Sequence, residues 1–257
     1  MCTLLFAYKA HPEYDFIFIG NRDEFKNRPS IGAHFLSSHP KVLAGIDQEK
    51  GGTWTGITAD GRIAFITNHR NLSLRRESSL SRGYLTLDFL IDTISPEDYL
   101  KKIQKHYAEY NPFNLVVGTV QELWFYSNIE NVIKPLTAGI YGLSNAVLDT
   151  PWYKVTKAKK RFTELISKNF SIDELFEILA DTEVPSDEHL PETGVPLETE
   201  RMLSTIHIDS PNYGTLFKTV ILVNKQGEVS FYEKQLRKDC WHSSDYSYVL
   251  ENFIIKT

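Results

Sequence analysis

Three short segments of the chain lack a hydrophilic face, and they constrain the fold more than any other feature of the sequence. Residues 3–10, 15–20 and 62–68 are rich in aliphatic and aromatic side chains and are predicted to be β-strands. Successive side chains of a strand point to opposite sides, so apolar residues at both odd and even positions mean that neither side faces water. Such strands must be covered on both sides, by a second sheet or by helices.

The other predicted elements come in blocks of strands and blocks of helices. Helices are predicted over residues 85–93, 95–107, 151–167 and 171–180, and residues 181–198 are expected to form a long surface loop. Further strands are predicted over residues 113–119, 122–126, 132–136, 203–208, 218–223, 229–233 and 246–255. This arrangement favours mostly antiparallel sheets flanked by helices. No segment has the composition of a linker, so we expect one domain over residues 1–257.

The composition excludes several classes of protein. A net charge of −5 argues against a general nucleic-acid binder, which normally carries a basic excess. No apolar run approaches the roughly 20 residues of a membrane-spanning helix, and the N-terminal stretch lacks the basic start of a signal peptide. Cys2 and Cys240 are too few and too far apart for a disulfide framework. We therefore expect a cytoplasmic protein with no membrane span and no nucleic-acid partner, and its oligomeric state stays open.

Cys2 is the first candidate for a catalytic residue. If Met1 is removed, Cys2 carries both a thiol and a free α-amine, whose reference pKa of about 7.7–8.0 lets it accept the thiol proton near neutral pH. A single residue would then supply the nucleophile and its base. The alternative is a small apolar residue that is buried at the start of an inner strand, as cysteines often are.

The stretch GNRDE, residues 20–24, ends the second predicted strand with polar groups. Asp23 could hold an α-ammonium group, and Arg22 could lower the pKa of a neighbouring thiol. In a straight strand Arg22 and Asp23 point to opposite faces, so both can approach Cys2 only if the chain bends. We expect Asp23, and not Glu24, to contact the Cys2 amine. The alternative is a solvated strand end with a local ion pair of little energetic value.

Two further motifs contain a side chain that could belong to a binding or catalytic site, an aromatic ring in the first and an amide in the second. In KGGTWTGI, residues 50–57, two glycines permit close backbone approach, and Trp54 could form a pocket wall or simply pack in the core. In YGLSNAVLDTPW, residues 141–152, Asn145 lies in a glycine-led turn. This motif is not a nucleophile elbow, because Ala146 stands where a second glycine would be needed.

The stretch ITNHRN ends the strand over residues 62–68. Asn68, His69 and Arg70, together with Arg75 and Arg76, could bind an anionic ligand, or they could form a basic surface loop. The eight histidines include no HExxH motif, and the chain contains no paired cysteines, phosphate loop or GxGxxG. We therefore predict no metal ion and no cofactor.

Taken together, MCTLLFAY, GNRDEF, GGTWTGI, TNHR, YGLSNAVLDTPW and TGVPLETERMLS resemble the NRDE family, also called the transport-and-Golgi-organisation family. The match runs in order over nearly the whole chain. The resemblance implies an α+β fold of the N-terminal-nucleophile hydrolase type, a four-layer αββα sandwich of mostly antiparallel sheets. It points to the cysteine branch of that superfamily, which includes penicillin V acylases, bile salt hydrolases and acid ceramidases.

This resemblance also implies roles for individual residues. Cys2, Arg22 and Asp23 match the branch's leading cysteine and its Arg–Asp pair at the end of the second strand, and Asn68 and Asn145 are the candidates for binding the oxyanion. Trp54, His69 and Arg70 are expected to contact the substrate. One departure concerns YGTLFKT: relatives often have an arginine where this chain has Leu216, and Lys218 follows two residues later.

The sequence therefore favours a cysteine amidohydrolase that cleaves a non-peptide C–N bond in a small acyl-amide, with Cys2 as the nucleophile once Met1 is removed. The competing hypothesis is a binding or trafficking protein that keeps the fold and carries a hydrophobic ligand such as haem or a lipid. In both cases the expected partner is a small molecule.

Overall fold

The fold consists of two antiparallel sheets that stack face to face. A computed structural model describes residues 2–74 and 80–251. The first sheet has the strand order β10–β1–β2–β11–β12–β13. Its strands are β1 (Cys2–Tyr8), β2 (Tyr14–Phe25), β10 (Gly139–Leu143), β11 (Tyr213–Asn224), β12 (Glu228–Arg237) and β13 (Cys240–Val249).

In the second sheet the strands follow the order of the chain, from β3 to β9. The strands are β3 (Ser30–Leu36), β4 (His39–Asp47), β5 (Thr55–Thr58), β6 (Arg62–Asn68), β7 (Phe113–Thr119), β8 (Leu123–Ser127) and β9 (Val132–Leu136). Both sheets are therefore built largely from hairpins and meanders, which need only short connections.

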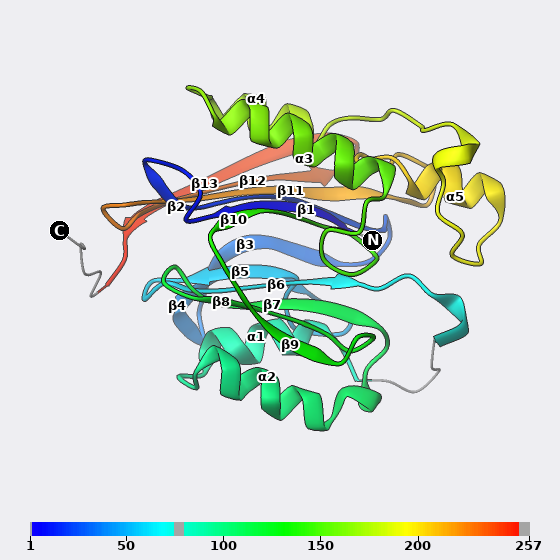
Figure 1. The fold of residues 1–257 in the computed structure, drawn as a ribbon. Helices are drawn as coiled ribbons and strands as arrows, with labels where there is room; N and C mark the ends of the chain where they lie inside the picture. Colours follow the sequence, from blue (N-terminus) through cyan, green and yellow to red (C-terminus); the bar gives the residue numbers. More distant parts are fainter. Residues whose placement is uncertain (1, 75–79, 252–257) are drawn as a thin grey trace.

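Helices cover the outer face of each sheet, as Figure 1 shows. The first sheet carries α3 (Tyr153–Ile166) and α4 (Ile172–Ile178), and the second carries α1 (Gly83–Ile91) and α2 (Pro96–Lys105). A fifth helix, α5 (Leu197–Leu203), lies beyond the end of the first sheet. The predicted four-layer αββα architecture is confirmed.

Three apolar clusters hold these layers together, and strand β1 shows how the sequence produces them. Its even-numbered residues, among them Leu4 and Phe6, pack in the cluster between the two sheets. Its odd-numbered residues Leu5 and Ala7 pack beneath α3 and α4. A third cluster lies between the second sheet and helices α1 and α2. The strands without a hydrophilic face are thus buried on both sides, as predicted.

One predicted element is wrong, and several strands escape prediction. Residues 203–208 were expected to form a strand, but Leu203 is the last residue of α5 and the following residues are irregular. Ile206 and Ile208 are nevertheless buried, because irregular chain can also cover a sheet. Strands β3, β4, β5 and β10 were not predicted as separate strands. The strand predicted over 246–255 corresponds to β13, which begins six residues earlier, and residues 252–255 lie outside the described residues.

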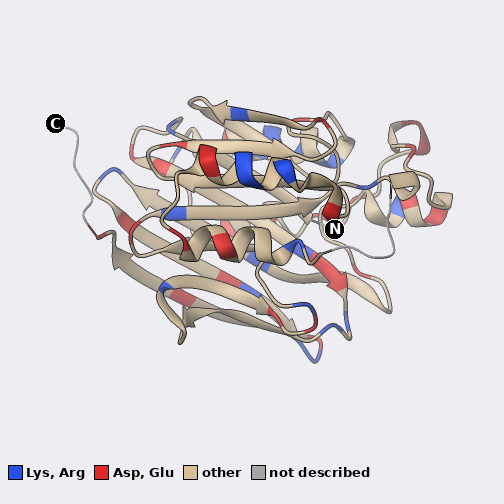
Figure 2. Ribbon diagram, turned by 90° about the horizontal axis from the view of Figure 1, so that it is seen from below, with Lys and Arg blue, Asp and Glu red and all other residues tan. Residues whose placement is uncertain are grey.

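Charged residues of both signs are interspersed over the strands and helices in the view of Figure 2, without a face of one sign. Among the described residues, no helix has the length and apolar character needed to cross a bilayer.

Candidate active site

Strand pairing brings the predicted catalytic residues together at one end of the first sheet. In the antiparallel pair β1–β2, Cys2 lies opposite Arg22. On the other side of β2, Thr215 of β11 pairs with Asp23 and Phe217 pairs with Arg22, so Leu216 is an extra residue in a β-bulge. The bulge therefore interrupts the regular alternation of side chains along β11 beside Arg22 and Asp23.

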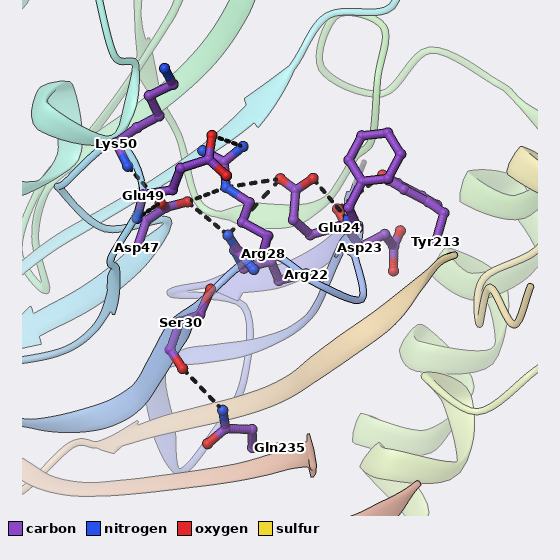
Figure 3. Close-up of polar contacts among 11 residues, drawn as sticks. Arg22, Asp23, Glu24, Arg28, Ser30, Asp47, Glu49, Lys50, Tyr213 and Gln235 are labelled. Carbon is purple, nitrogen blue, oxygen red and sulfur yellow. Dashed lines mark hydrogen bonds and ion pairs between the residues drawn. The ribbon is translucent and has the colours of Figure 1, made fainter. Parts of the chain in front are cut away.

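Arg22 and Asp23 point to opposite faces of the sheet, as strand periodicity requires. The Arg22 guanidinium stacks on the Trp54 ring at 4.4 Å and donates a hydrogen bond to the Asp47 carboxylate at 2.9 Å. The Asp23 carboxylate instead accepts a hydrogen bond of 2.6 Å from the Thr215 hydroxyl. Figure 3 shows Arg22 and Glu24 turned toward Asp47, whereas the Asp23 carboxylate points away from them.

The Cys2 thiol is partly buried, and several charges and dipoles act on it. Burial raises the pKa of the thiol. The positive charge of the amino terminus, a hydrogen bond from the Asp23 backbone N–H and the Arg22 guanidinium lower this pKa, but together they do not outweigh burial. With Met1 in place the thiol therefore stays protonated at neutral pH. The predicted reactivity near neutral pH concerns the chain without Met1 and stays a prediction.

Asp23 is a deeply buried carboxyl group with cationic neighbours. Burial raises its pKa, while the charge of the amino terminus, the Lys154 ammonium, the Thr215 hydroxyl and Arg22 act in the opposite direction. The Tyr213 hydroxyl donates to the Asp23 backbone carbonyl at 2.9 Å. The amino-terminal charge that acts on Asp23 is that of Met1, whereas the amine that Asp23 is expected to hold is that of Cys2. The contact between the Asp23 carboxylate and the Cys2 nitrogen itself stays a prediction.

Asp47 organises the charged wall on the other side of Arg22. Its carboxylate accepts hydrogen bonds from Arg22 at 2.9 Å and Arg28 at 2.8 Å, and from the backbone N–H groups of Glu49 and Lys50 at 3.0 Å each. Burial opposes ionisation, but these hydrogen bonds hold the pKa of Asp47 below its ordinary value. The carboxylate therefore fixes both guanidinium groups and the loop that precedes Trp54.

A pocket of about 290 Å³ lies over these residues. Five of the predicted site residues line it, namely Cys2, Arg22, Asp23, Trp54 and Asn68. Further charged lining residues are Glu24, Arg28, Asp47, Lys50 and Arg82, and Ile66 and Leu80 add apolar surface. Both sheets contribute, because Asn68 ends β6 and Asp47 ends β4. The pocket is small, lined largely by charged side chains and partly open to solvent.

Asn145 lies next to this pocket but is not part of its lining. Its side-chain amide donates to the Asn68 backbone carbonyl at 2.9 Å, and its backbone carbonyl accepts a hydrogen bond from the Arg70 backbone N–H at 2.7 Å. The neighbouring Ser144 hydroxyl donates to the Cys2 carbonyl at 2.8 Å. The turn over residues 141–152 therefore ties the start of β1 to the end of β6.

His69 and Arg70 lie elsewhere. They line a second cavity of about 820 Å³, formed with Trp152 and residues 188–193. The Arg70 guanidinium makes a buried ion pair of 2.8 Å with Glu200 and stacks over Trp152. Both residues were expected to contact the substrate, but they do not line the pocket at Cys2. Arg75 and Arg76 lie outside the described residues.

Leu216, which stands where an arginine was expected from the resemblance, is not among the residues that line the Cys2 pocket. The Leu216 side chain packs with Trp54 and Phe217 in a small apolar cluster. Lys218 lies opposite Asn21, on the helix-covered face of the sheet, with its ammonium 4.8 Å from the Trp241 ring. The bulge thus provides an apolar edge behind Arg22 rather than a further charge.

One functional candidate escaped sequence reasoning. Lys154, in the first turn of α3, is only 2% exposed, and its ammonium interacts with Asp23 and Cys2. A signal was available, because Lys154 precedes Ala158 by four residues and Phe162 by eight, which puts a lysine on the apolar stripe of the helix. Among the described residues, no three His, Cys, Asp or Glu side chains gather as the ligands of a metal ion would.

Comparison with known proteins places the chain in a wider context. The family model described as Transport and Golgi organisation 2 matches residues 1–238. The human Transport and Golgi organization protein 2 homolog is 33% identical over 277 residues, covering 98% of this chain and 100% of the human protein. The bovine homolog is 33% identical over 262 residues, with 92% and 93% covered.

Among solved structures, a mutant of the conjugated bile acid hydrolase from Clostridium perfringens matches with a TM-score of 0.53 at 10% identity, over 96% of both chains. At this identity the likeness concerns the fold alone. The fold is that of the N-terminal-nucleophile hydrolases.

Proposed function

The chain belongs to the Transport and Golgi organisation 2 family, and from this premise we propose that it is a cysteine amidohydrolase with Cys2 as its nucleophile after removal of Met1. The observation that carries the proposal is the position of the Cys2 sulfur. It lies at the wall of a pocket, accepts a hydrogen bond from the Asp23 backbone N–H, and lies opposite Arg22 in the sheet.

In the first chemical step the thiol proton moves to the α-amine of Cys2, and the sulfur attacks the carbonyl carbon of the substrate. An amine that accepts the proton as the attack proceeds removes the need for a standing thiolate, which burial disfavours. Asp23 holds and orients the resulting ammonium. Arg22, fixed by Asp47 and Trp54, supplies positive charge near the sulfur.

The electrons of the carbonyl bond move to oxygen, and this oxyanion needs hydrogen-bond donors. The Asn68 side chain lines the pocket and is the first candidate. Asn145 donates one amide hydrogen to the Asn68 carbonyl, which leaves its second hydrogen as another candidate and fixes the orientation of the amide. In this proposal Asn145 both supports Asn68 and contributes to the oxyanion site.

Collapse of the tetrahedral intermediate breaks the C–N bond, and the leaving amine takes the proton from the α-ammonium. A thioester remains on Cys2. Water attacks this thioester, the α-amine accepts a proton from the water, and the sulfur regains a proton as the acid is released.

The size of the pocket favours a small amide. Its apolar surface, from Trp54, Ile66 and Leu80, suits a short apolar acyl part. The competing hypothesis, a carrier of haem or lipid, fits less well with a lining that contains Arg22, Arg28, Lys50 and Arg82 together with Asp23, Glu24 and Asp47.

A hydrolysis screen tests the proposal. The full chain, with Met1 shown to be absent by intact mass, is incubated with amides of varied acyl length, and the released amine is measured. We expect at least one amide to be hydrolysed, and we expect Cys2→Ala to lower the rate about a thousandfold or more.

Cys240→Ala is the matched control, because it removes the exposed cysteine and should leave the rate unchanged. Stoichiometric binding of haem or lipid that survives Cys2→Ala, with no hydrolysis of any amide, would overturn the proposal in favour of a carrier.

A further inference from the structure

Lys154 is a buried charge that the proposed mechanism does not use. It lies in the first turn of α3, where the helix dipole is positive and disfavours a cation. Its side chain is 2% exposed. Removing an ammonium group from water costs several kcal/mol unless partners compensate for it. A lysine at this position is therefore expected to have a specific partner.

The ammonium has one direct hydrogen-bond acceptor among the described residues, the Leu203 carbonyl at 2.8 Å. This carbonyl fixes where the charge lies but does not neutralise it. Burial lowers the pKa of Lys154 to about 8, and the Asp23 carboxylate is the strongest influence that raises it again. The charged or titratable groups that act on Lys154 come from β1, β2, the segment after β6, and α5: Cys2, Asp23, Arg70 and Glu200.

Of the two carboxylates near Lys154, Glu200 already has partners. It makes a 2.8 Å ion pair with Arg70, and it accepts a hydrogen bond from the Thr193 backbone N–H at 3.0 Å. Asp23 accepts a hydrogen bond from the neutral Thr215 hydroxyl at 2.6 Å, whereas the Arg22 guanidinium points to the opposite face and binds Asp47. Lys154 accordingly acts on Asp23 more strongly than Arg22 does.

We propose that Lys154 is a positioning residue, which keeps Asp23 ionised so that Asp23 can hold the Cys2 amine, and thereby sets the pH range over which Cys2 reacts. This inference rests on the proposed N-terminal nucleophile. The groups that face the Asp23–Cys2 pair are the amino terminus, Arg22 of β2, Lys154 of α3, and Tyr213 and Lys218 of β11. Two lysines bring a positive side chain to the face toward which Asp23 points, Lys154 of α3 and Lys218 of β11, and Lys154 is the one that acts most strongly on Asp23.

The test measures the alkylation rate of Cys2 by iodoacetamide as a function of pH, in the full chain without Met1. Lys154→Met removes the charge and keeps the length of the side chain, and Lys154→Arg keeps the charge. Loss of a nearby cation makes deprotonation harder, so we expect Lys154→Met to move the rise in rate to higher pH by about one unit. Lys154→Arg should restore most of the wild-type profile.

Lys160→Met is the matched control, because it removes an exposed lysine from the same helix and should not move the profile. Equal profiles for wild type and Lys154→Met would overturn the inference. A displaced profile without hydrolysis of any amide would retain the role of Lys154 and reject the proposed activity. Hydrolysis of an amide together with an unchanged pH profile would support the proposed activity and reject the role of Lys154.

A double substitution keeps the inference testable if Lys154→Met does not fold. Asp23→Asn combined with Lys154→Met removes both buried charges, so the double variant should recover folded protein that Lys154→Met alone loses. If the double variant is as poorly folded as Lys154→Met, the two charges are not coupled, and the inference fails.

Discussion

Glu233 illustrates how one buried side chain links the two sheets. Its carboxylate accepts a hydrogen bond from the Ala33 backbone N–H of β3 at 2.6 Å, and the Thr219 hydroxyl of β11 donates to it at 3.3 Å. Burial raises the pKa of Glu233 from its ordinary 4.5 to about 7. The folded chain therefore binds this proton more tightly than the unfolded chain does. Its contribution to stability is present below pH 4.5 and decreases as the pH rises toward 7.

Replacing Glu233 with glutamine should stabilise the protein at pH 8 and have little effect at pH 4. The glutamine carbonyl can still accept from Ala33, and the cost of burying a negative charge disappears. A displacement of 2.5 pKa units, from 4.5 to about 7, limits the gain at pH 8 to about 3 kcal/mol. Urea unfolding at the two pH values measures it. Glu228→Gln, at the exposed start of the same strand, is the control; a gain for Glu233→Gln that is equal at both pH values would contradict the prediction.

The sequence predicted the site residues that strand pairing brings close to Cys2. It did not predict those that only the packing of a helix on the sheet brings there. Arg22 and Asp23 could be found because hairpin pairing returns the end of β2 to the start of β1. Lys154 could not be assigned, because only the packing of α3 on the first sheet brings its ammonium near Asp23. His69 and Arg70 follow Asn68 directly, yet the chain leaves β6 there and carries them into another cavity.

Among the elements, the loop between β4 and β5 depends on two glycines. Gly51 and Gly52 both have positive φ, 71° and 79°. A Cβ on Gly52 would lie 2.2 Å from the backbone carbon of Gly83, at the start of α1, and the Thr53 backbone N–H donates to the Gly83 carbonyl at 3.0 Å. The GGTW motif therefore presses this loop against α1, and this contact places Trp54 beneath Arg22.

Gly52→Ala should destabilise the protein by about 3 kcal/mol or more, because it combines backbone strain with a steric clash. Gly194→Ala is the matched control: its φ is also positive, at 86°, but a Cβ there would come no closer than 4.0 Å to a neighbouring atom. That variant should lose about 1–2 kcal/mol from backbone strain alone. Denaturant unfolding of both variants measures the difference. Equal losses would show that the approach to Gly83 is not tight.

Prediction of elements from the sequence worked where burial was two-sided and failed where it was partial. β1, β2 and β6 are nearly continuous runs of buried residues, so their pattern is unambiguous. β3 mixes exposed and buried positions and is interrupted by register irregularities, so its alternation is weak. Residues 203–208 are apolar like a strand, but they are used as irregular cover beyond α5. Apolar content reports burial, and burial does not specify the backbone conformation.

For the whole molecule, the stacking of the sheets determines where a site can form. Cys2, Arg22 and Asp23 come from the first sheet, whereas Asp47 and Asn68 come from the second, and the pocket lies where these strand ends meet. The same arrangement buries the Cys2 thiol and raises its pKa while Met1 is present. Removal of Met1 would turn this unreactive thiol into a nucleophile with its own base.

The most direct test of this claim compares the rate of Cys2 alkylation by iodoacetamide at pH 7 in two forms of the chain. One form has lost Met1, and the other retains it because methionine aminopeptidase was inhibited during expression; intact mass identifies each. We predict that Cys2 reacts at least about tenfold faster in the form without Met1, while Cys240 reacts equally in both. Equal Cys2 rates in the two forms, each rising only near the free-thiol pKa of about 8.5, would contradict the assignment of Cys2 as an N-terminal nucleophile.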